Sequence, residues 1–294
     1  MPTDALARPL PRRLRKRLAE GLGLSLADVD ECWNADRVRV ITPESNEPRR
    51  LSLETLIFEQ DRVLLDGTPI GPAVAPVHAL LNKPKYVTST ASDPRGKSDL
   101  SPYLRAMPPG CFAVGRLDRE TTGLLLFTND GDLGSAILRP DHSTTKDYWL
   151  WIDEPLADDD PRLARFQSGV IHDGQLLTAK SAQIRARSEY ATELELTLTQ
   201  GKKRQIRHMC RALNLRLVHL HRYRIGSLSD DGLALGNWRF LEALEVEALW
   251  GSAGGRSAHR ERQVAALSRL AAKVRAEGAP QARLERWLEQ ELSE

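Results

Sequence analysis

An aspartate lies between two apolar segments near the middle of the chain, within the sequence GRLDRETTGLLLFTNDG of residues 115–131. The residues before it, 112–115, and those after it, 123–128, are almost all apolar or glycine, which predicts two buried strands. Asp118 is therefore expected in a short loop between strands. A carboxylate in that position is either an ion-paired structural residue or a catalytic one, and the spacing alone favours the structural interpretation.

A second segment, 201–224, contains eight lysines and arginines and no acid. An i, i+3, i+4, i+7 spacing of apolar residues predicts a helix over 203–213 with one buried face, formed by Ile206, Met209, Cys210 and Leu213. The opposite face of this helix carries the basic side chains Arg204, Arg207, His208 and Arg211. Such a stripe must face solvent, an RNA or an anionic group in a cleft.

The N-terminal segment 8–17 is also basic, with six lysines and arginines and no acid. Because the net charge of the whole chain is only +2, positive charge is segregated into patches. Segregated positive patches on a nearly neutral protein indicate binding to a phosphate backbone, and a solvated basic face is the alternative. Two such blocks, with histidines beside the second, favour a polyanion as the ligand.

The composition divides the chain into parts. The sequence Gly-Pro-Ala-Val-Ala-Pro at 71–76 is typical of a linker, and it separates a small basic module, 1–70, from a larger domain, 77–250. Residues 251–294 form a charged extension, in which we expect a loop at 251–256 followed by one or two helices.

Hydrophobic periodicity predicts the elements of each part. The small module is expected to contain helices at 12–24 and 26–33 and short strands at 37–41 and 62–65. The larger domain is expected to have strands at 77–81, 112–115, 123–128, 147–152 and 192–198 and helices at 132–138 and 203–213. This alternation predicts an α+β fold, in which a mixed, mainly antiparallel sheet carries helices on its faces and a central cleft holds Asp118.

Several classes of protein are disfavoured by composition. The cysteines, Cys32, Cys111 and Cys210, are far apart and match no zinc or CxxC spacing, so we expect reduced thiols and no metal. No stretch approaches the roughly 20 apolar residues that span a bilayer, and the N-terminus lacks the apolar core of a secretion signal. We therefore expect a cytoplasmic protein without a membrane partner, and an Arg-rich organellar transit peptide is the alternative, which Asp4 and the helical pattern that follows disfavour. We also expect the protein to act as a monomer.

Residues 115–131 resemble the catalytic-aspartate signature of the RsuA/RluB/RluE/RluF branch of pseudouridine synthases, GRLDxxTxGLLLxTNDG. Four further elements resemble that family in the same order: Lys146-Asp147-Tyr148, residues 201–209, residues 220–226 and residues 233–239. Together the five elements cover about residues 77–241. The resemblance implies an enzyme that isomerises a specific uridine to pseudouridine in structured RNA, with ribosomal RNA as the expected substrate and tRNA as the alternative.

The resemblance also implies roles for particular residues. Asp118 would be the catalytic nucleophile, and Arg207 would pair with it and keep it ionised. Arg116 would take the place of the base that is flipped out of the RNA, although an ion pair with Asp118 is its alternative role. Tyr148 would stack on the flipped uracil, as an exposed aromatic residue in the pocket that adds little to the core. The remaining substrate-binding residues would line a phosphate track: Lys146, Lys203, Arg204 and Gln205. The reaction needs no metal and no organic cofactor.

The N-terminal part resembles the small RNA-binding module of alpha-L type that precedes many members of this branch. The basic residues at 12–16 and Leu64-Leu65-Asp66-Gly67 fit that pattern. Residues 35–38 and the loop at 43–48 depart from it, so the module is a degenerate one.

Two other functions are compatible with parts of the sequence. A catalytically silent RNA-binding or ribosome-assembly protein would account for the basic blocks, but not for the ordered elements around Asp118 and Tyr148. A hydrolase would need a second carboxylate or base paired with Asp118, and no such spacing is visible. Isomerisation of uridine is therefore the function that the sequence predicts.

Overall fold

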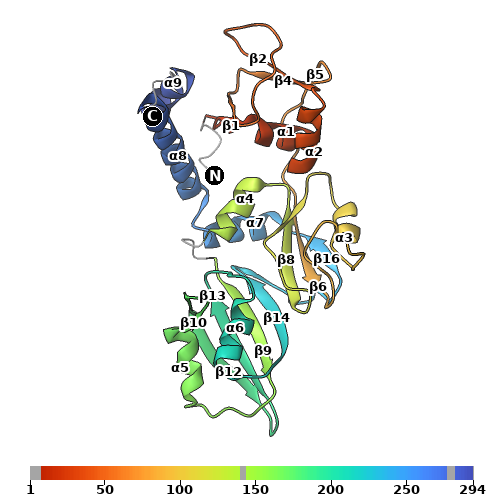
Figure 1. Cartoon of the computed structure of the whole chain (residues 1–294), viewed down its shortest axis with the longest axis vertical. Helices are drawn as coiled ribbons and strands as arrows, with labels where there is room; N and C mark the ends of the chain where they lie inside the picture. Colours follow the sequence, from red (N-terminus) through yellow and green to blue (C-terminus); the bar gives the residue numbers. More distant parts are fainter. Residues whose placement is uncertain (1–7, 140–143, 277–281, 294) are drawn as a thin grey trace. The chain divides into compact units, whose positions relative to one another are not determined.

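The computed structural model describes residues 8–139, 144–276 and 282–293 (Figure 1). The chain forms two compact units, one of which is Pro76–Gly255. In the other, Met1–Ala75 lie together with Arg256–Glu294. Among the described residues, no helix is long and apolar enough to cross a membrane.

A nine-stranded sheet organises the larger unit, in the order β12-β13-β9-β14-β8-β6-β16, with β15 paired to β14 and β7 paired to β8. The strands are β6 (His78–Lys83), β7 (Phe112–Val114), β8 (Thr122–Thr128), β9 (Lys146–Ile152), β12 (Ser181–Arg187), β13 (Thr192–Leu198), β14 (Leu217–Ile225), β15 (Leu228–Ser229) and β16 (Trp238–Phe240). Every pair is antiparallel except β14 with β8, which is parallel. The expected α+β fold with a mixed, mainly antiparallel sheet is confirmed.

The parallel junction in the middle of the sheet requires a glycine. Gly123 on β8 is opposite Arg222 on β14 and has φ +108°. A Cβ atom at this position would lie 2.2 Å from the carbonyl oxygen of Arg222. Only a residue without a side chain allows the two backbones to approach this closely.

Helices cover the sheet, and their bounds are α3 (Ser101–Arg105), α4 (Gly131–Leu138), α5 (Pro161–Ser168), α6 (Gln205–Ala212) and α7 (Ala243–Ser252). Strand β8 is buried along its whole length, and its central residues, 124–127, are all apolar because both faces are covered. Leu124 and Leu126 belong to the core that includes residues of α4 and α7, whereas Leu125 and Phe127 belong to a separate core with Leu100.

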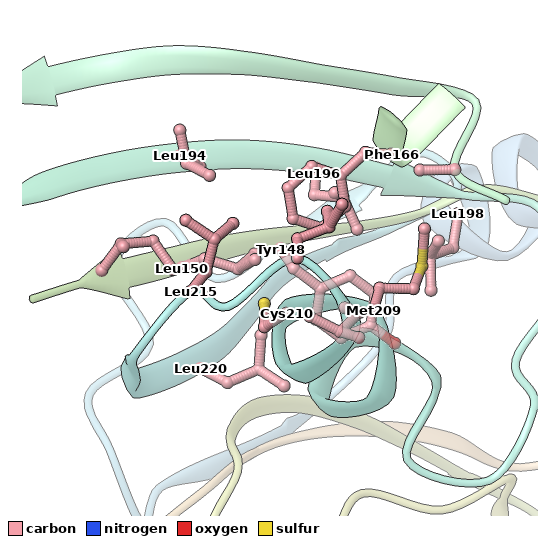
Figure 2. Close-up of a cluster of buried hydrophobic side chains, with 14 of the residues drawn as sticks. Tyr148, Leu150, Phe166, Leu194, Leu196, Leu198, Met209, Cys210, Leu215 and Leu220 are labelled. Atoms are coloured by element: carbon pink, nitrogen blue, oxygen red, sulfur yellow. The ribbon is translucent and has the colours of Figure 1, made fainter. Parts of the chain in front are cut away.

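The other half of the sheet is buried on one face only. Tyr148 and Leu150 on β9 join Leu194 and Leu196 on β13 in a core that α5 and α6 complete (Figure 2). The intervening residues of β9, Trp149 and Trp151, are partly exposed. This alternation is typical of an antiparallel sheet with one covered face. A hairpin of β10 (Val170–His172) and β11 (Gln175–Leu177) lies beside α6.

The smaller unit contains α1 (Leu14–Leu22), α2 (Leu26–Asn34), β1 (Arg12–Arg13), β2 (Val38–Ile41), β3 (Leu56–Ile57), β4 (Arg62–Leu65), β5 (Thr68–Pro69), α8 (Arg256–Ala276) and α9 (Ala282–Glu291). A core that includes Leu14, Leu18 and Val40 holds the N-terminal elements together. A second cluster packs Leu284 and Trp287 of α9 with residues from the N-terminal part, namely Leu10, Leu56 and Phe58. The C-terminal helices therefore share an apolar core with the N-terminal part.

Most predicted elements are confirmed to within about two residues at each end. The strands at 62–65 and 192–198 have the predicted bounds. The helix expected at 12–24 is shorter, Leu14–Leu22, because Gly23 adopts a left-handed conformation, φ +63°, and ends it. The Asn-Asp-Gly sequence after β8 leads directly into α4, because Asp130 is the N-cap of this helix and accepts hydrogen bonds from the amides of Asp132 and Leu133. The loop expected at 251–256 is only three residues long, because α7 continues to Ser252 and α8 begins at Arg256.

Candidate active site

Asp118 lies in the loop between β7 and β8, as the apolar segments on either side predict. The hydroxyl of Ser89 anchors this loop, because it accepts from the amide of Leu117 at 3.1 Å and donates to the carbonyl of Leu117 at 2.7 Å. The amide of Thr121 donates to the carbonyl of Asp118 at 3.0 Å. The loop is thus rigid, while the Asp118 side chain is 28% exposed and accessible to a substrate.

Two arginines at the start of α6 face the carboxylate. Nε of Arg207 is 3.5 Å and Nη1 of Arg204 is 3.8 Å from Oδ2 of Asp118. Nη2 of Arg207 donates to the hydroxyl of Thr121 at 3.2 Å, so this guanidinium also holds the loop. The Nε atom of Arg207 is buried and has no hydrogen-bond partner among the described residues. The pairing is therefore electrostatic, and it leaves the carboxylate oxygens available for substrate.

The carboxylate opens into a cavity of about 450 Å³. Apolar residues from β7, β8, α4 and β14 form part of its wall, including Val114, Leu126, Ile137 and Ile225. All eight residues that the sequence singled out line this one cavity: Arg116, Asp118, Lys146, Tyr148, Lys203, Arg204, Gln205 and Arg207. They are separated by up to 91 positions in the chain (207 − 116), and only the fold brings them together. An apolar wall with a few charged groups suits a flipped-out base.

Tyr148 is more deeply buried than the sequence suggested. We expected an exposed aromatic residue that adds little to the core, and this was wrong, because its side chain is 8% exposed and belongs to the core of β9, β13 and α6 (Figure 2). Since Tyr148 also lines the cavity, its ring is both a part of the core and a wall of the site.

Lys146 is a buried cation. Its Nζ atom donates to the carbonyls of Ile137 at 3.1 Å and Thr144 at 3.0 Å. Burial, and next the nearby charge of Arg222, lower the pKa of Lys146 from 10.5 to about 8. With its amine tied to the main chain, Lys146 belongs to the cavity wall more than to an exposed phosphate track.

Lys83, at the end of β6, was missed by the sequence analysis. It is fully buried, and its Nζ atom donates to the carbonyls of Pro84 and Val87, both at 2.9 Å. Burial is the main cause that lowers its pKa to about 8, and the charge of Arg222 adds to it. The available signal was a lysine two residues after the apolar run of 77–81, separated from it only by Asn82, since a lysine is almost never fully buried without partners.

The remaining predicted residues differ in their exposure and in their hydrogen bonds. Arg116 is exposed, and within the described part of the chain it forms no ion pair with Asp118, which pairs with Arg204 and Arg207 instead. Lys203 and Arg204 are also exposed. Gln205 is 3% exposed, and its side chain donates to the carbonyl of Thr178 and accepts from the amide of Lys202, so it braces the loop before α6.

A buried hydrogen-bond chain lies next to the Asp118 loop and was also missed. Oγ1 of Thr122 is 2.7 Å from Nδ1 of His221 and 3.1 Å from Nε2 of His219. Nε2 of His221 is 2.6 Å from Oδ2 of Asp230. The carboxylate fixes the orientation of the His221 ring, and the ring fixes Thr122, which begins β8. The described residues contain no group of histidines, cysteines and carboxylates that could hold a metal ion.

The comparisons with known proteins agree with this geometry. Residues 77–212 match the family model for RNA pseudouridylate synthase. A ribosomal small subunit pseudouridine synthase A from Yersinia pestis is 33% identical over 240 residues, which are 81% of this chain and 97% of that protein. The corresponding protein of Escherichia coli is also 33% identical, over 81% of this chain and 99% of its own length. A crystal structure of a pseudouridylate synthase, 26% identical, superposes with a TM-score of 0.55 and covers 82% of this chain and 100% of that one.

The chain belongs to the RNA pseudouridine synthase family. It is therefore an isomerase that converts uridine to pseudouridine in RNA, as the signature around Asp118 implied.

Proposed function

We propose that this protein isomerises a uridine in small-subunit ribosomal RNA, with Asp118 as the nucleophile. The observation that carries the choice of RNA is the similarity to ribosomal small subunit pseudouridine synthases along nearly their whole length. The observation that supports the nucleophile is an accessible carboxylate that opens into a partly apolar cavity and has no hydrogen-bonded partner among the described residues.

The reaction breaks the bond from ribose to the base nitrogen and rotates the base. The base is then rejoined to the ribose through its carbon 5. Asp118 acts as the nucleophile on the target nucleotide. The charges of Arg207 and Arg204 keep its carboxylate ionised and oriented towards the cavity. The ring of Tyr148 supports the flipped uracil by stacking. Arg116, exposed and unpaired with Asp118, takes the place that the base leaves in the RNA.

Basic side chains around the cavity bind the RNA backbone. Lys203 and Arg204 are exposed beside the cavity, so they are placed to contact phosphates next to the target nucleotide. The N-terminal part of the smaller unit serves as an accessory RNA-binding module. We further propose that the protein acts as a monomer in the cytoplasm, where ribosomal RNA is found.

Tritium release from transcripts labelled at carbon 5 of uridine tests the proposal. Small-subunit rRNA should release tritium in the presence of the protein, whereas large-subunit rRNA and tRNA transcripts should not. Release from another transcript alone would overturn the choice of substrate. Mapping pseudouridines in ribosomes from a strain that lacks the gene would then identify the modified position.

Asp118→Asn tests the nucleophile in the same assay. We expect no detectable tritium release and an RNA affinity close to that of the wild type, because phosphate contacts dominate affinity and the substitution removes none. Comparable release by the Asn variant would show that Asp118 is not the nucleophile. A protein that binds RNA but releases no tritium from any transcript would be a silent RNA-binding or assembly factor.

A further inference from the structure

Tyr86 combines a strained backbone with an exposed ring. Its φ is +70°, in the left-handed region that a bulky aromatic residue rarely adopts. The side chain is 53% exposed, so burial of the ring does not offset this strain. Backbone strain without a compensating core contact is characteristic of residues that serve a functional site.

The main chain places Tyr86 beside the catalytic loop. Its amide donates to the carbonyl of Arg119 at 2.6 Å, and Arg119 directly follows Asp118. Three residues after Tyr86, Ser89 is hydrogen-bonded to Leu117, which directly precedes Asp118. The segment from Tyr86 to Ser89 therefore contacts the catalytic loop on both sides of the aspartate.

Two cations lie over the ring of Tyr86. Nζ of Lys85 is 5.2 Å and Cζ of Arg119 is 5.1 Å from the ring centroid. Both side chains are exposed, and among the described residues neither forms an ion pair with a carboxylate. The adjacent acid, Glu120, is 3.9 Å from Nη1 of Arg207. These distances are near the outer limit of a cation–π contact, about 6 Å, so an incoming base could displace either cation.

Flipping a uridine out of RNA leaves its neighbours without a stacking partner. An exposed aromatic ring on a segment that is hydrogen-bonded to the Asp118 loop supplies one, since base–aromatic stacking is independent of sequence. Cations at the same ring supply counter-charges for the phosphates that flank the stacked base.

We propose that Tyr86, Lys85 and Arg119 form a second nucleotide-binding subsite next to the catalytic cavity. Tyr86 stacks on an unpaired base that flanks the target uridine, and the two cations bind the phosphates of that nucleotide. The proposal rests on the RNA-modifying activity of the family and not on the identity of the natural RNA.

Tyr86→Gly separates a role in binding from a role in folding. Glycine adopts a positive φ without strain, so the variant should melt at the same temperature as the wild type or higher. Binding of a short fluorescein-labelled oligouridylate, measured by anisotropy, should weaken by about tenfold to a hundredfold because the stacking surface is lost. Tyr86→Trp should bind within about twofold of the wild type or more tightly, since it keeps the ring.

The matched control is Tyr190→Ala, which removes a tyrosine that is 73% exposed in the turn between β12 and β13. This variant should bind the oligonucleotide as the wild type does. Arg119→Met should reduce the salt dependence of binding by up to about one unit of log affinity per log salt.

Equal affinity of Tyr86→Gly and the wild type would overturn the subsite, and so would a wild type that does not bind the oligonucleotide. An equal loss in Tyr190→Ala would show a non-specific effect and would also overturn it. Because binding is measured without turnover and on an RNA of no particular origin, these results do not depend on the role of Asp118 or on the choice of small-subunit rRNA.

Discussion

At the scale of single residues, the site combines one accessible carboxylate with several cations, some of them exposed and others buried. Arg204 and Lys203 are exposed, whereas Lys83 and Lys146 are buried and use their amines to bind main-chain carbonyls. The exposed cations can move towards a phosphate. The buried ones cannot, and they contribute a fixed positive potential near the cavity.

Tyr148 belongs both to the hydrophobic core and to the wall of the cavity. Tyr148→Phe keeps the ring in the core, and the phenol forms no hydrogen bond within the described part of the chain, so we expect an unchanged melting temperature. Tyr148→Leu removes core contacts and should lower the free energy of unfolding by about 1–3 kcal/mol. Chemical denaturation of both variants checks this, with tritium release by the Phe variant reporting on the hydroxyl. A Leu variant as stable as the wild type would contradict the burial of the ring.

The buried lysines predict an unusual dependence of stability on pH. Burial lowers the pKa of Lys83 and of Lys146 from 10.5 to about 8, so each ammonium is less favourable in the folded than in the unfolded chain. Below pH 8 this penalty is complete, and it is relieved as the pH rises towards 10.5. Between pH 8 and 9 the unfolded chain binds more protons, so each lysine should raise the free energy of unfolding by about 1 kcal/mol.

Denaturant unfolding at pH 8 and pH 9 measures this rise. Lys146→Met should lose about half of the increase, since Lys83 remains. The measurement stops at pH 9 because of Cys210, whose pKa burial raises from 9.0 to about 12. Once the Cys210 thiol ionises in the unfolded chain, it lowers the free energy of unfolding and so opposes the effect of the lysines. An increase that is the same in the wild type and in Lys146→Met would show that Lys146 is not the buried charge responsible.

At the scale of elements, the parallel contact of β8 with β14 connects the two antiparallel halves of the sheet. Through it, the strand that follows Asp118 is aligned with the strand that carries Arg222 and His221. Thr122 and His221 are directly opposite each other in this strand pair, and their side chains also form a hydrogen bond. The position of the Asp118 loop thus depends on a backbone approach between strands that are about 100 residues apart in the sequence, Thr122 pairing with His221.

Gly123→Ala should disrupt this junction. A methyl group would lie 2.2 Å from the carbonyl oxygen of Arg222, and φ +108° is strained for alanine. We therefore expect the free energy of unfolding to fall by about 3 kcal/mol or more, with little soluble protein. Gly251→Ala in α7 is the control, because its Cβ would meet nothing within 4 Å and alanine favours a helix. Thermal melting compares the two. Equal stability of both variants would contradict the close approach of β8 and β14.

At the scale of the whole molecule, the C-terminal helices and the N-terminal part share an apolar core, with Leu10, Leu56 and Phe58 packed against Leu284 and Trp287. A deletion of residues 1–70 alone would leave that apolar surface of α8 and α9 exposed. The larger unit ends at Gly255, so a chain of residues 76–255 should fold and remain monodisperse in size-exclusion chromatography, whereas 71–294 should aggregate. A well-behaved 71–294 chain would show that the shared core is dispensable.

The basic N-terminal block has fewer free charges than its sequence suggests. Arg13 pairs with Glu54, Arg15 with Asp30, and Lys16 with Glu20. Each phosphate contact contributes about −0.9 to the slope of log affinity against log salt on duplex RNA, by analogy with DNA. The 76–255 chain should therefore differ from the full chain by only about one or two units in this slope. A difference of four or more would mean that RNA displaces these internal pairs.

The sequence by itself determined the family, the main strands of the larger unit and a set of residues that line one cavity beside Asp118. These depend on local patterns: the apolar runs that flank Asp118, the spacing of Ile206, Met209 and Cys210, and a signature of contiguous residues. Local patterns are predictable because a strand or helix face repeats within a few residues.

Only the tertiary structure decided which of those residues are exposed and which are buried or bound to other parts of the protein. The burial of Lys83 and Tyr148, the bracing role of Gln205, the ion pairs of the N-terminal block and the core shared by both ends of the chain all depend on partners far away in sequence. Sequence patterns carry no information on such partners, because long-range contacts are selected by the packing of the whole core and not by the residues adjacent to them. The same holds for Tyr86, whose positive φ and hydrogen bond to the loop of Asp118 have no signal in its own segment.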